Sequence, residues 1–197
     1  RNIDGQDVFF NYRGVQAKGD FGRDGVYMPE YYYDKDNGRK VTKAGFVKDN
    51  RGLTYYLDEK GEKVLGLHEI NGDLYYFRQG GAYKYTQLGD MWQDSINYIN
   101  GKIYYFGHDG KAIKNRFYQW GNDWYYFYAD GTAATGAVQI NGQKLYFDKN
   151  HGRQVKGAFA PDGHYYDENS GELVTNQTRT INGVTYHFDE NGNATKV

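Results

Sequence analysis

One short sequence recurs along the chain and restricts the folds open to it. Four close copies join Asn-Gly to a run of aromatic residues: INGDLYYF (70–77), INGKIYYF (99–106), INGQKLYF (140–147) and INGVTYHF (181–188). Weaker aromatic runs end at residues 10, 33, 57, 127 and 166, so nine copies follow at intervals of 19 to 29 residues. A period of this length is typical of a repeat architecture, in which each unit packs mainly against its neighbours.

The Asn-Gly pairs predict the tips of β-hairpins. A type I′ turn needs positive φ at both central residues, which Asn and Gly tolerate best. Tips are expected at Asn71-Gly72, Asn100-Gly101, Asn141-Gly142 and Asn182-Gly183. A lone hairpin is marginal in water, so the units must stack. The sequence therefore predicts an all-β fold without helices: a β-solenoid of about nine stacked β-hairpin repeats that forms a single elongated domain over residues 1–197. The long interval at 78–98 is expected to hold a divergent turn or an insertion.

The core must be built largely from tyrosine. Leu, Ile, Val and Phe together account for only 38 of the 197 residues, whereas there are 22 tyrosines. A tyrosine core is expected to be thin and close to water, because each hydroxyl needs a hydrogen-bond partner.

Charge and hydropathy exclude several classes of partner. Lys and Arg (24) nearly cancel Asp and Glu (25), and no basic run is present, so we expect neither nucleic acid nor an anionic membrane as a partner. No apolar stretch approaches the ~18 residues that span a bilayer. The chain opens at Arg1 on polar sequence without a visible signal peptide, which is typical of a fragment of a mature protein. The absence of cysteine excludes disulfides and thiolate zinc sites.

Strand alternation separates two columns of side chains in each aromatic strand. One column is nearly all apolar and is expected to form the core; it includes Tyr55, Phe77, Phe106, Phe127, Phe147 and Phe188. The other column places aromatic residues beside charged and polar ones, as in Glu30 with Tyr32, Trp124 with Tyr126, and Gly163 with Tyr165. An outward row of tyrosines suits a neutral, ring-shaped, hydroxyl-rich ligand. Alternatively, these tyrosines only cover the edge of the core or pack between hairpins.

Units of the form NG-x-x-YYFD followed by G-x-Q-x-K-G-x-F resemble the glucan-binding repeats of glucansucrases, and more distantly choline-binding and toxin repeats. The resemblance extends over essentially the whole chain. It implies a sugar pocket between consecutive hairpins, formed by a Gln-x-Lys pair and a stacking Tyr from the following aromatic strand. Two stretches match: GVQAKGDF, with Gln16, Lys18 and then Tyr32, and GRQVKGAF, with Gln154, Lys156 and then Tyr165.

The Gln-x-Lys pair is also sensible locally, because residues two apart on a strand point the same way and would offer an amide and a cationic donor to one sugar. Lys114 and Tyr126 form a poorer third site, since Ala112 replaces the glutamine. Other units depart further and carry Lys40 and Thr42, Lys63 and Leu65, Ala133 and Thr135, or Leu173 and Thr175 at the two positions. The plain alternative for every pair is a solvated strand face.

The residues of an enzyme are missing. The chain has two serines, no cysteine and five histidines without metal-site spacing. A glycosidase pair is one interpretation of the carboxylates Asp58, Asp148, Asp167 and Asp189. They occupy one repeat column before a turn, however, where Asp ordinarily bonds its own backbone. We therefore expect a noncatalytic chain with neither cofactor nor metal.

The sequence as a whole predicts a monomeric carbohydrate-binding repeat domain. The resemblance implies that it binds α-glucan, such as dextran or isomalto-oligosaccharides, as part of a larger secreted or cell-surface glucansucrase. Two alternatives remain open: a cell-wall or choline-binding surface anchor, and a structural spacer. Choline recognition needs aromatic cages, and three tryptophans, Trp92, Trp120 and Trp124, are too few to line one in every unit.

Overall fold

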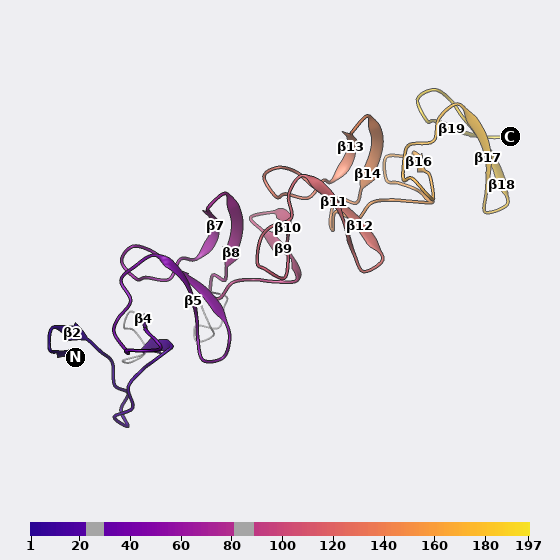
Figure 1. Cartoon of the computed structure of the whole chain (residues 1–197). Coiled ribbons are helices and arrows are strands. Elements are labelled where there is room, and N and C mark those ends of the chain that lie inside the picture. The colour runs from indigo at the N-terminus through magenta and orange to yellow at the C-terminus, as the bar shows by residue number, and fades with distance from the viewer. Residues whose placement is uncertain (23–29, 81–88) are drawn as a thin grey trace. The chain divides into compact units, whose positions relative to one another are not determined.

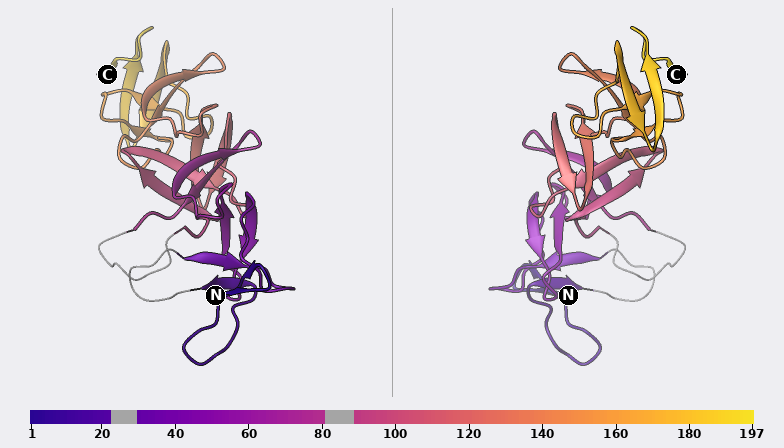
Figure 2. Two further views of the ribbon diagram at one scale, coloured as in Figure 1. Left: turned by 90° about the vertical axis from the view of Figure 1, so that its left-hand side faces the viewer. Right: turned by 90° about the vertical axis from the view of Figure 1, so that its right-hand side faces the viewer.

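The computed structural model describes residues 1–22, 30–80 and 89–197, and within these ranges every regular element is a β-strand. Figures 1 and 2 show paired strands recurring from the N-terminus to the C-terminus. The described part of the chain contains no helix, hence none long and apolar enough to cross a membrane. The prediction of an all-β chain of repeated hairpins is confirmed.

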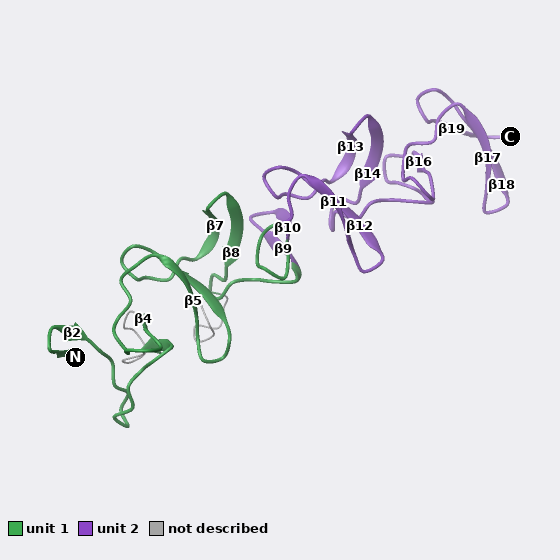
Figure 3. Cartoon of the chain, in the orientation of Figure 1, with its two compact units in different colours: residues 1–95, 106–112 green, residues 96–105, 113–197 purple. Residues whose placement is uncertain are grey.

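The chain divides into two compact units, residues 1–95 with 106–112 and residues 96–105 with 113–197 (Figure 3). The first unit contains β1 (Asn2–Ile3), β2 (Gln6–Asp7), β3 (Asp20–Gly22), β4 (Tyr31–Tyr33), β5 (Gly45–Lys48), β6 (Thr54–Leu57), β7 (Gly66–Ile70) and β8 (Asp73–Phe77). Apart from Ser95 and Phe106, the second contains β9 (Ser95–Ile99), β10 (Lys102–Phe106), β11 (Arg116–Trp120), β12 (Asp123–Phe127), β13 (Gly136–Ile140), β14 (Gln143–Phe147), β15 (Ala158–Phe159), β16 (Tyr165–Tyr166), β17 (Gln177–Ile181), β18 (Val184–Phe188) and β19 (Ala194–Lys196).

The hairpin tips have the geometry that Asn-Gly predicts. In the hairpin of β13 and β14, Asn141 has φ 51° and Gly142 φ 84°, and Ile140 pairs with Gln143 across the two-residue turn. Asn71, Asn100 and Asn182, each followed by glycine, also adopt positive φ. Because both central residues are left-handed, the turn twist matches that of the strands, as in a type I′ turn.

Each consecutive pair of strands is its own antiparallel sheet, and only the last, β17-β18-β19, has three strands among the described elements. The hairpins do not merge into one closed sheet. Each hairpin is followed by a turn that contains a glycine of positive φ, such as Gly152, here called the turn glycine. The residues just after this glycine are called the connector, and the connectors link successive hairpins. In the connector 154–156, Gln154 donates its backbone N–H to Trp124 O, and Val155 donates to Tyr146 O, each at 2.8 Å. One connector thus bonds the hairpin just before it and the hairpin before that.

The same two-step pattern recurs within each unit. In each case two consecutive backbone N–H groups of the connector donate to carbonyls of two different hairpins. The donors and acceptors are Lys40 to Asp7 with Val41 to Tyr32, Met91 to Thr54 with Trp92 to Tyr76, Ala133 to Ile103 with Ala134 to Tyr126, and Leu173 to Lys144 with Val174 to Tyr165. These bonds satisfy backbone groups that an isolated two-stranded sheet leaves open at its edges.

The aromatic column assigned to the core is buried. Phe77, Phe106, Phe127, Phe147 and Phe188 each have 0% exposure. The apolar clusters are small and repeated; one, for example, contains Ala134, Ile140, Leu145 and Phe147. Among the described residues each of these clusters joins only a few neighbouring hairpins, as expected for a thin core distributed along the repeats.

The second column of tyrosines is also largely buried, which corrects the expectation that it faces outward. Tyr32, Tyr76, Tyr105, Tyr146 and Tyr165 are all under 10% exposed. The cause is the connector of the following repeat, which runs across this column and bonds its backbone. Partners on the neighbouring strand close the rings in, as in the edge-to-face pair of Phe21 and Tyr32 with centroids 5.3 Å apart. Tyr56 and Tyr126 are half-buried.

The long interval at 78–98 lies partly outside the described residues. Within its described part, Arg78 Nε donates to Asp90 Oδ1 at 2.9 Å, and Arg78 N donates to Asp90 O at the same distance. Asp90 is nearly buried at 5% exposure, so the ion pair is held against the hairpin of β7 and β8.

Candidate ligand-binding site

The first Gln-x-Lys pair lies against the turn of the next repeat. Lys18 Nζ donates to Asp36 O at 3.4 Å. The side chain of Gln16 lies over Gly38, so closely that a Cβ there would be 2.4 Å from Gln16 Nε2. Both side chains therefore contact the turn 34–38, as the shared direction of a Gln-x-Lys pair predicts.

The second pair repeats this arrangement. Lys156 Nζ donates to Asn169 O at 3.0 Å, and Gln154 Nε2 donates to Ser170 O at 3.4 Å. A Cβ on Gly171 would lie 2.3 Å from Gln154 Nε2. In both sites the lysine bonds the carbonyl two residues before the turn glycine. The two stretches that match the sequence pattern thus have the same local structure.

The turns present these carbonyls because an aspartate holds their N–H groups. Asp167 Oδ1 accepts from the backbone N–H of Asn169 and of Ser170, at 2.9 and 2.8 Å. The N–H of Ser170 and then the guanidinium of Arg179 hold the pKa of Asp167 well below its usual value. Asp34 binds the N–H groups of Asp36 and Asn37 in the first site, and these lower its pKa as well. With the N–H groups held by the carboxylate, the carbonyls of the turn are available to the connector.

The tyrosines assigned to the two sites are packed inside the repeats. Tyr32 is 6% exposed and its hydroxyl donates to Lys48 O at 2.8 Å, while burial raises its pKa. Tyr165 is also 6% exposed, and its ring packs on Phe159 and Phe188 with centroids 5.2 and 6.0 Å away. A ring enclosed to this degree offers little surface on which a sugar can stack.

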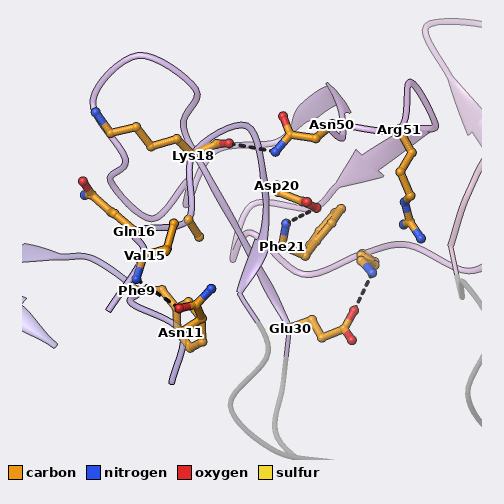
Figure 4. A pocket seen from close by; sticks show the side chains of 12 residues that line it. Phe9, Asn11, Val15, Gln16, Lys18, Asp20, Phe21, Glu30, Asn50 and Arg51 are labelled. Carbon is orange, nitrogen blue, oxygen red and sulfur yellow. Dashed lines mark hydrogen bonds and ion pairs between the residues drawn. The ribbon is translucent and has the colours of Figure 1, made fainter. Parts of the chain in front are cut away.

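A cavity of about 500 Å³ adjoins the first pair (Figure 4). Besides Gln16 and Lys18, its lining consists of Phe9, Asn11, Val15, Ala17, Asp20, Phe21, Glu30, Asn50, Arg51 and Lys63. Tyr32 is not in this lining; its cross-strand partner Phe21 is. The aromatic surface available here therefore comes from Phe9 and Phe21, which sequence reasoning missed because it looked only at the strand after the pair.

Trp124 is the exposed aromatic residue at the second pair. Its exposure is 37%, and Lys156 Nζ lies 5.7 Å from the centroid of its ring. The carbonyl of Trp124 also accepts the backbone N–H of Gln154. An indole face, an ammonium and a side-chain amide thus gather at one place. Trp124 belongs to the column that was expected to face outward. Its contact with the connector of Gln154 could not be predicted from sequence alone, because Trp124 lies in the hairpin before the one that precedes this connector.

The third assigned site is less complete. Tyr126 is half-buried and packs edge-on against Phe117 and Tyr128, with centroids 4.9 and 5.5 Å away. Lys114 is half-buried in the preceding connector. A second cavity of about 240 Å³ lies elsewhere in this unit and is lined by Tyr98, Gly101, Lys102, Ile103, Thr132, Ala133, Thr135 and Lys149. It opens where the small residues Ala133 and Thr135 replace Gln and Lys.

The repeated aspartates serve their own turns, as predicted. Asp58 Oδ1 accepts from the N–H groups of Lys60 and Glu62, and Asp189 Oδ1 from those of Asn191 and Asn193. The N–H of Glu62 holds the pKa of Asp58 below its usual value, and the side-chain amide and N–H of Asn193 do so for Asp189. A general acid needs a raised pKa, so these carboxylates are unsuited to that role. Among the described residues, no three His, Asp or Glu side chains gather as a metal site would require.

The repeats match two known families. The family described as choline-binding repeat matches residues 134–177, and the family described as cell wall binding repeat matches residues 44–63, 115–133 and 179–194. The chain therefore contains repeats that match the cell-wall-binding and choline-binding types. Each cell-wall-binding match falls on one hairpin and the turn that follows it, whereas the choline-binding match spans two hairpins, β13-β14 and β15-β16.

Curated relatives with these repeats include two glucosyltransferases of Streptococcus mutans serotype c. Glucosyltransferase-S is 37% identical over 202 residues and glucosyltransferase-I is 40% identical over 216 residues. The alignments cover 98% and 96% of this chain but only 13% and 14% of the two enzymes. The chain therefore corresponds to a small repeat region of such enzymes, which is noncatalytic.

Solved structures place the fold with choline-binding repeat domains. Choline binding protein F from Streptococcus pneumoniae superposes with a TM-score of 0.62 at 28% identity, over 87% of this chain and 55% of that protein. The choline-binding domain of CbpL from the same species superposes with a TM-score of 0.68 at 22% identity, over 100% of this chain and 96% of that domain. The second likeness concerns the fold alone.

Proposed function

We propose that this chain is a noncatalytic carbohydrate-binding domain that holds α-glucan of the dextran type. The observation that carries the proposal is the identity of 37–40% with glucosyltransferases over nearly the whole chain. The parent protein would then be a glucosyltransferase that acts outside the cell, secreted or attached to the surface.

The two Gln-x-Lys pairs are the proposed binding sites. Each offers an amide and an ammonium beside an aromatic side chain, the half-buried Phe9 at Gln16 and the exposed Trp124 at Gln154. A glucose ring presents C–H groups to an aromatic face and hydroxyls to donors at its edge, so this combination suits a neutral sugar. The tyrosines Tyr32 and Tyr165 would support the sites from within, and Lys114 with Tyr126 would add a weaker one.

The repeats are proposed to continue as a monomeric β-solenoid that forms a single domain over residues 1–197. Support comes from the connectors that contain Lys40, Met91, Ala133, Gln154 and Leu173. Each of these bonds the two hairpins before it by the same pair of backbone hydrogen bonds. Repetition of one such step generates a solenoid.

Binding at each site is expected to be weak and the sites together stronger. One stacked ring with two or three hydrogen bonds gives a Kd near millimolar, about −4 kcal/mol, because association entropy offsets most of the contact energy. A dextran chain long enough to engage both sites gains roughly 10²- to 10⁴-fold in apparent affinity.

Affinity electrophoresis in gels with and without dextran tests the proposal. Lys18→Ala and Lys156→Ala should each reduce retardation by dextran, and the double variant should nearly abolish it. Lys60→Ala, which removes the same charge from an exposed turn, is the matched control and should migrate like the parent. A folded double variant that is still retarded as strongly as the parent would refute these sites.

Choline binding is the second candidate, because a choline-binding repeat family matches residues 134–177 and choline binding protein F is 28% identical. Retention on a choline resin, compared with retention on dextran, separates the two. Glucan binding predicts retention on dextran and free passage through the choline resin.

A further inference from the structure

The ammonium of Lys63 lies in a cage of two aromatic rings and a carboxylate. Lys63 Nζ is 3.8 Å from the ring centroid of Phe21, 4.9 Å from that of Tyr55, and 2.7 Å from Glu30 Oε2. The side chain of Lys63 is only 12% exposed. Cations are attracted to ring faces within about 6 Å of the centroid, and more strongly when water is excluded. Three separate attractions therefore act on this one ammonium.

The walls of the cage are fixed by the surrounding fold. The rings of Phe21 and Tyr55 are packed with centroids 4.7 Å apart and planes at 67°. Tyr55 has 0% exposure, and its hydroxyl donates to Asp49 Oδ2 at 3.1 Å. Phe21, Glu30 and Lys63 also line the cavity of about 500 Å³ beside Gln16 (Figure 4). The cage therefore opens onto a space that a small ligand can reach.

Two aromatic faces and a carboxylate are also the surroundings that a quaternary ammonium ligand requires. We propose that Lys63 fills a latent ammonium-binding cage of this chain and thereby excludes quaternary ammonium ligands such as choline from the cavity. Lys63 competes with an advantage, because a tethered ammonium does not lose the translational freedom that a free ligand loses on binding. The cavity is thus closed to quaternary ammonium ligands by a residue of the chain itself.

A lysine also lies over a ring at another connector, where Lys40 Nζ is 3.2 Å from the ring centroid of Tyr31. Lys40 and Lys63 stand where other connectors carry the glutamine of the Gln-x-Lys pair. Lysine in place of glutamine at these two positions is explained if its ammonium occupies the face of a neighbouring ring, Tyr31 or Phe21.

Binding of tetramethylammonium tests the proposal without any glucan. In Lys63→Ala the ammonium and its stem are removed, and the cage should bind tetramethylammonium and choline with a Kd in the millimolar range, at least about tenfold tighter than the parent. Lys60→Ala is the control for the loss of charge and should gain nothing. Adding Glu30→Gln to Lys63→Ala should weaken the new binding, because the carboxylate wall is then neutral. Titration followed by NMR or calorimetry measures these affinities.

Two results would overturn the proposal. One is a folded Lys63→Ala chain that shows no saturable binding up to about 100 mM tetramethylammonium, which saturates any millimolar site. The other is found in the parent chain itself, which keeps the test open if Lys63→Ala does not fold. The methylene protons next to Lys63 Nζ should show an upfield ring-current shift that tetramethylammonium leaves unchanged, and loss of that shift during the titration would mean that the lysine does not block the cage. Dextran retention is not used in either test, so failure of the glucan proposal would be seen separately.

Discussion

Gly171 leaves the space that the side chain of Gln154 fills. A Cβ on Gly171 would lie 2.3 Å from Gln154 Nε2, and Gly38 stands in the same relation to Gln16 at 2.4 Å. The turn glycine of one repeat and the connector glutamine of the repeat before it are therefore fitted to each other. The glutamine serves the stacking of repeats as well as the proposed sugar site.

The first prediction follows from this contact. Gly171→Ala should lower the free energy of unfolding by more than Gly142→Ala does. Both glycines have positive φ, 72° and 84°, so each alanine carries backbone strain of about 1–3 kcal/mol. Only Gly171 would also collide with a neighbour, since nothing lies within 4 Å of a Cβ on Gly142. Urea unfolding measures both. Gln154→Ala in the Gly171→Ala chain should recover part of the difference, and equal losses for the two glycine variants would contradict the fit.

The second prediction concerns the thin core. Phe147→Ala should lower the free energy of unfolding by about 3–5 kcal/mol, because a fully buried aromatic ring leaves a cavity. Phe159→Ala should cost less, since Phe159 is 40% exposed. Thermal or chemical denaturation followed by circular dichroism compares them. A Phe147→Ala chain as stable as the parent would show that each repeat holds without its central ring.

The third prediction tests whether Tyr32 stabilises the repeat or binds the glucan directly. Tyr32→Phe removes the hydroxyl that donates to Lys48 O at 2.8 Å, and it should destabilise the chain by about 1 kcal/mol. Retention on dextran should stay at the level of the parent, because the ring is buried and remains. Retention lost at unchanged stability would instead mean that the tyrosine hydroxyl binds the glucan directly.

The fourth prediction concerns acid. Hydrogen bonds hold the pKa values of Asp34, Asp167 and Asp189 below the unfolded value near 3.9. They come from backbone N–H groups of the turn at Asp34, from such groups and Arg179 at Asp167, and from the side chain and backbone N–H of Asn193 at Asp189. A depressed pKa contributes stability that is fully present above the unfolded pKa and is lost as the pH falls toward the folded pKa. The midpoint temperature of thermal unfolding should therefore decrease as the pH is lowered from about 4 to about 2. Asp167→Asn should make this decrease with pH less steep. A midpoint that is constant over this range would contradict the role assigned to the turns.

The sequence alone determined the parts of the structure that depend on neighbours along the chain. Asn-Gly requires left-handed backbone at Asn141 and Gly142, alternation places Phe147 and Leu145 on one face, and Asp167 binds its own turn. Each of these follows from a few consecutive residues. The pairing of Gln16 with Lys18 on one turn could likewise be predicted, because both residues lie in one short strand-like segment.

Only the tertiary structure decided which face of each strand meets solvent. Alternation shows that Tyr32 and Tyr165 share a column, but it does not reveal that the connector of the next repeat covers that column. It also gave no sign that Trp124 would lie beside Lys156, or that Lys63 would reach Phe21 and Glu30. These contacts join residues more than 30 positions apart, and they depend on how one hairpin is stacked on the next rather than on any local preference of the chain.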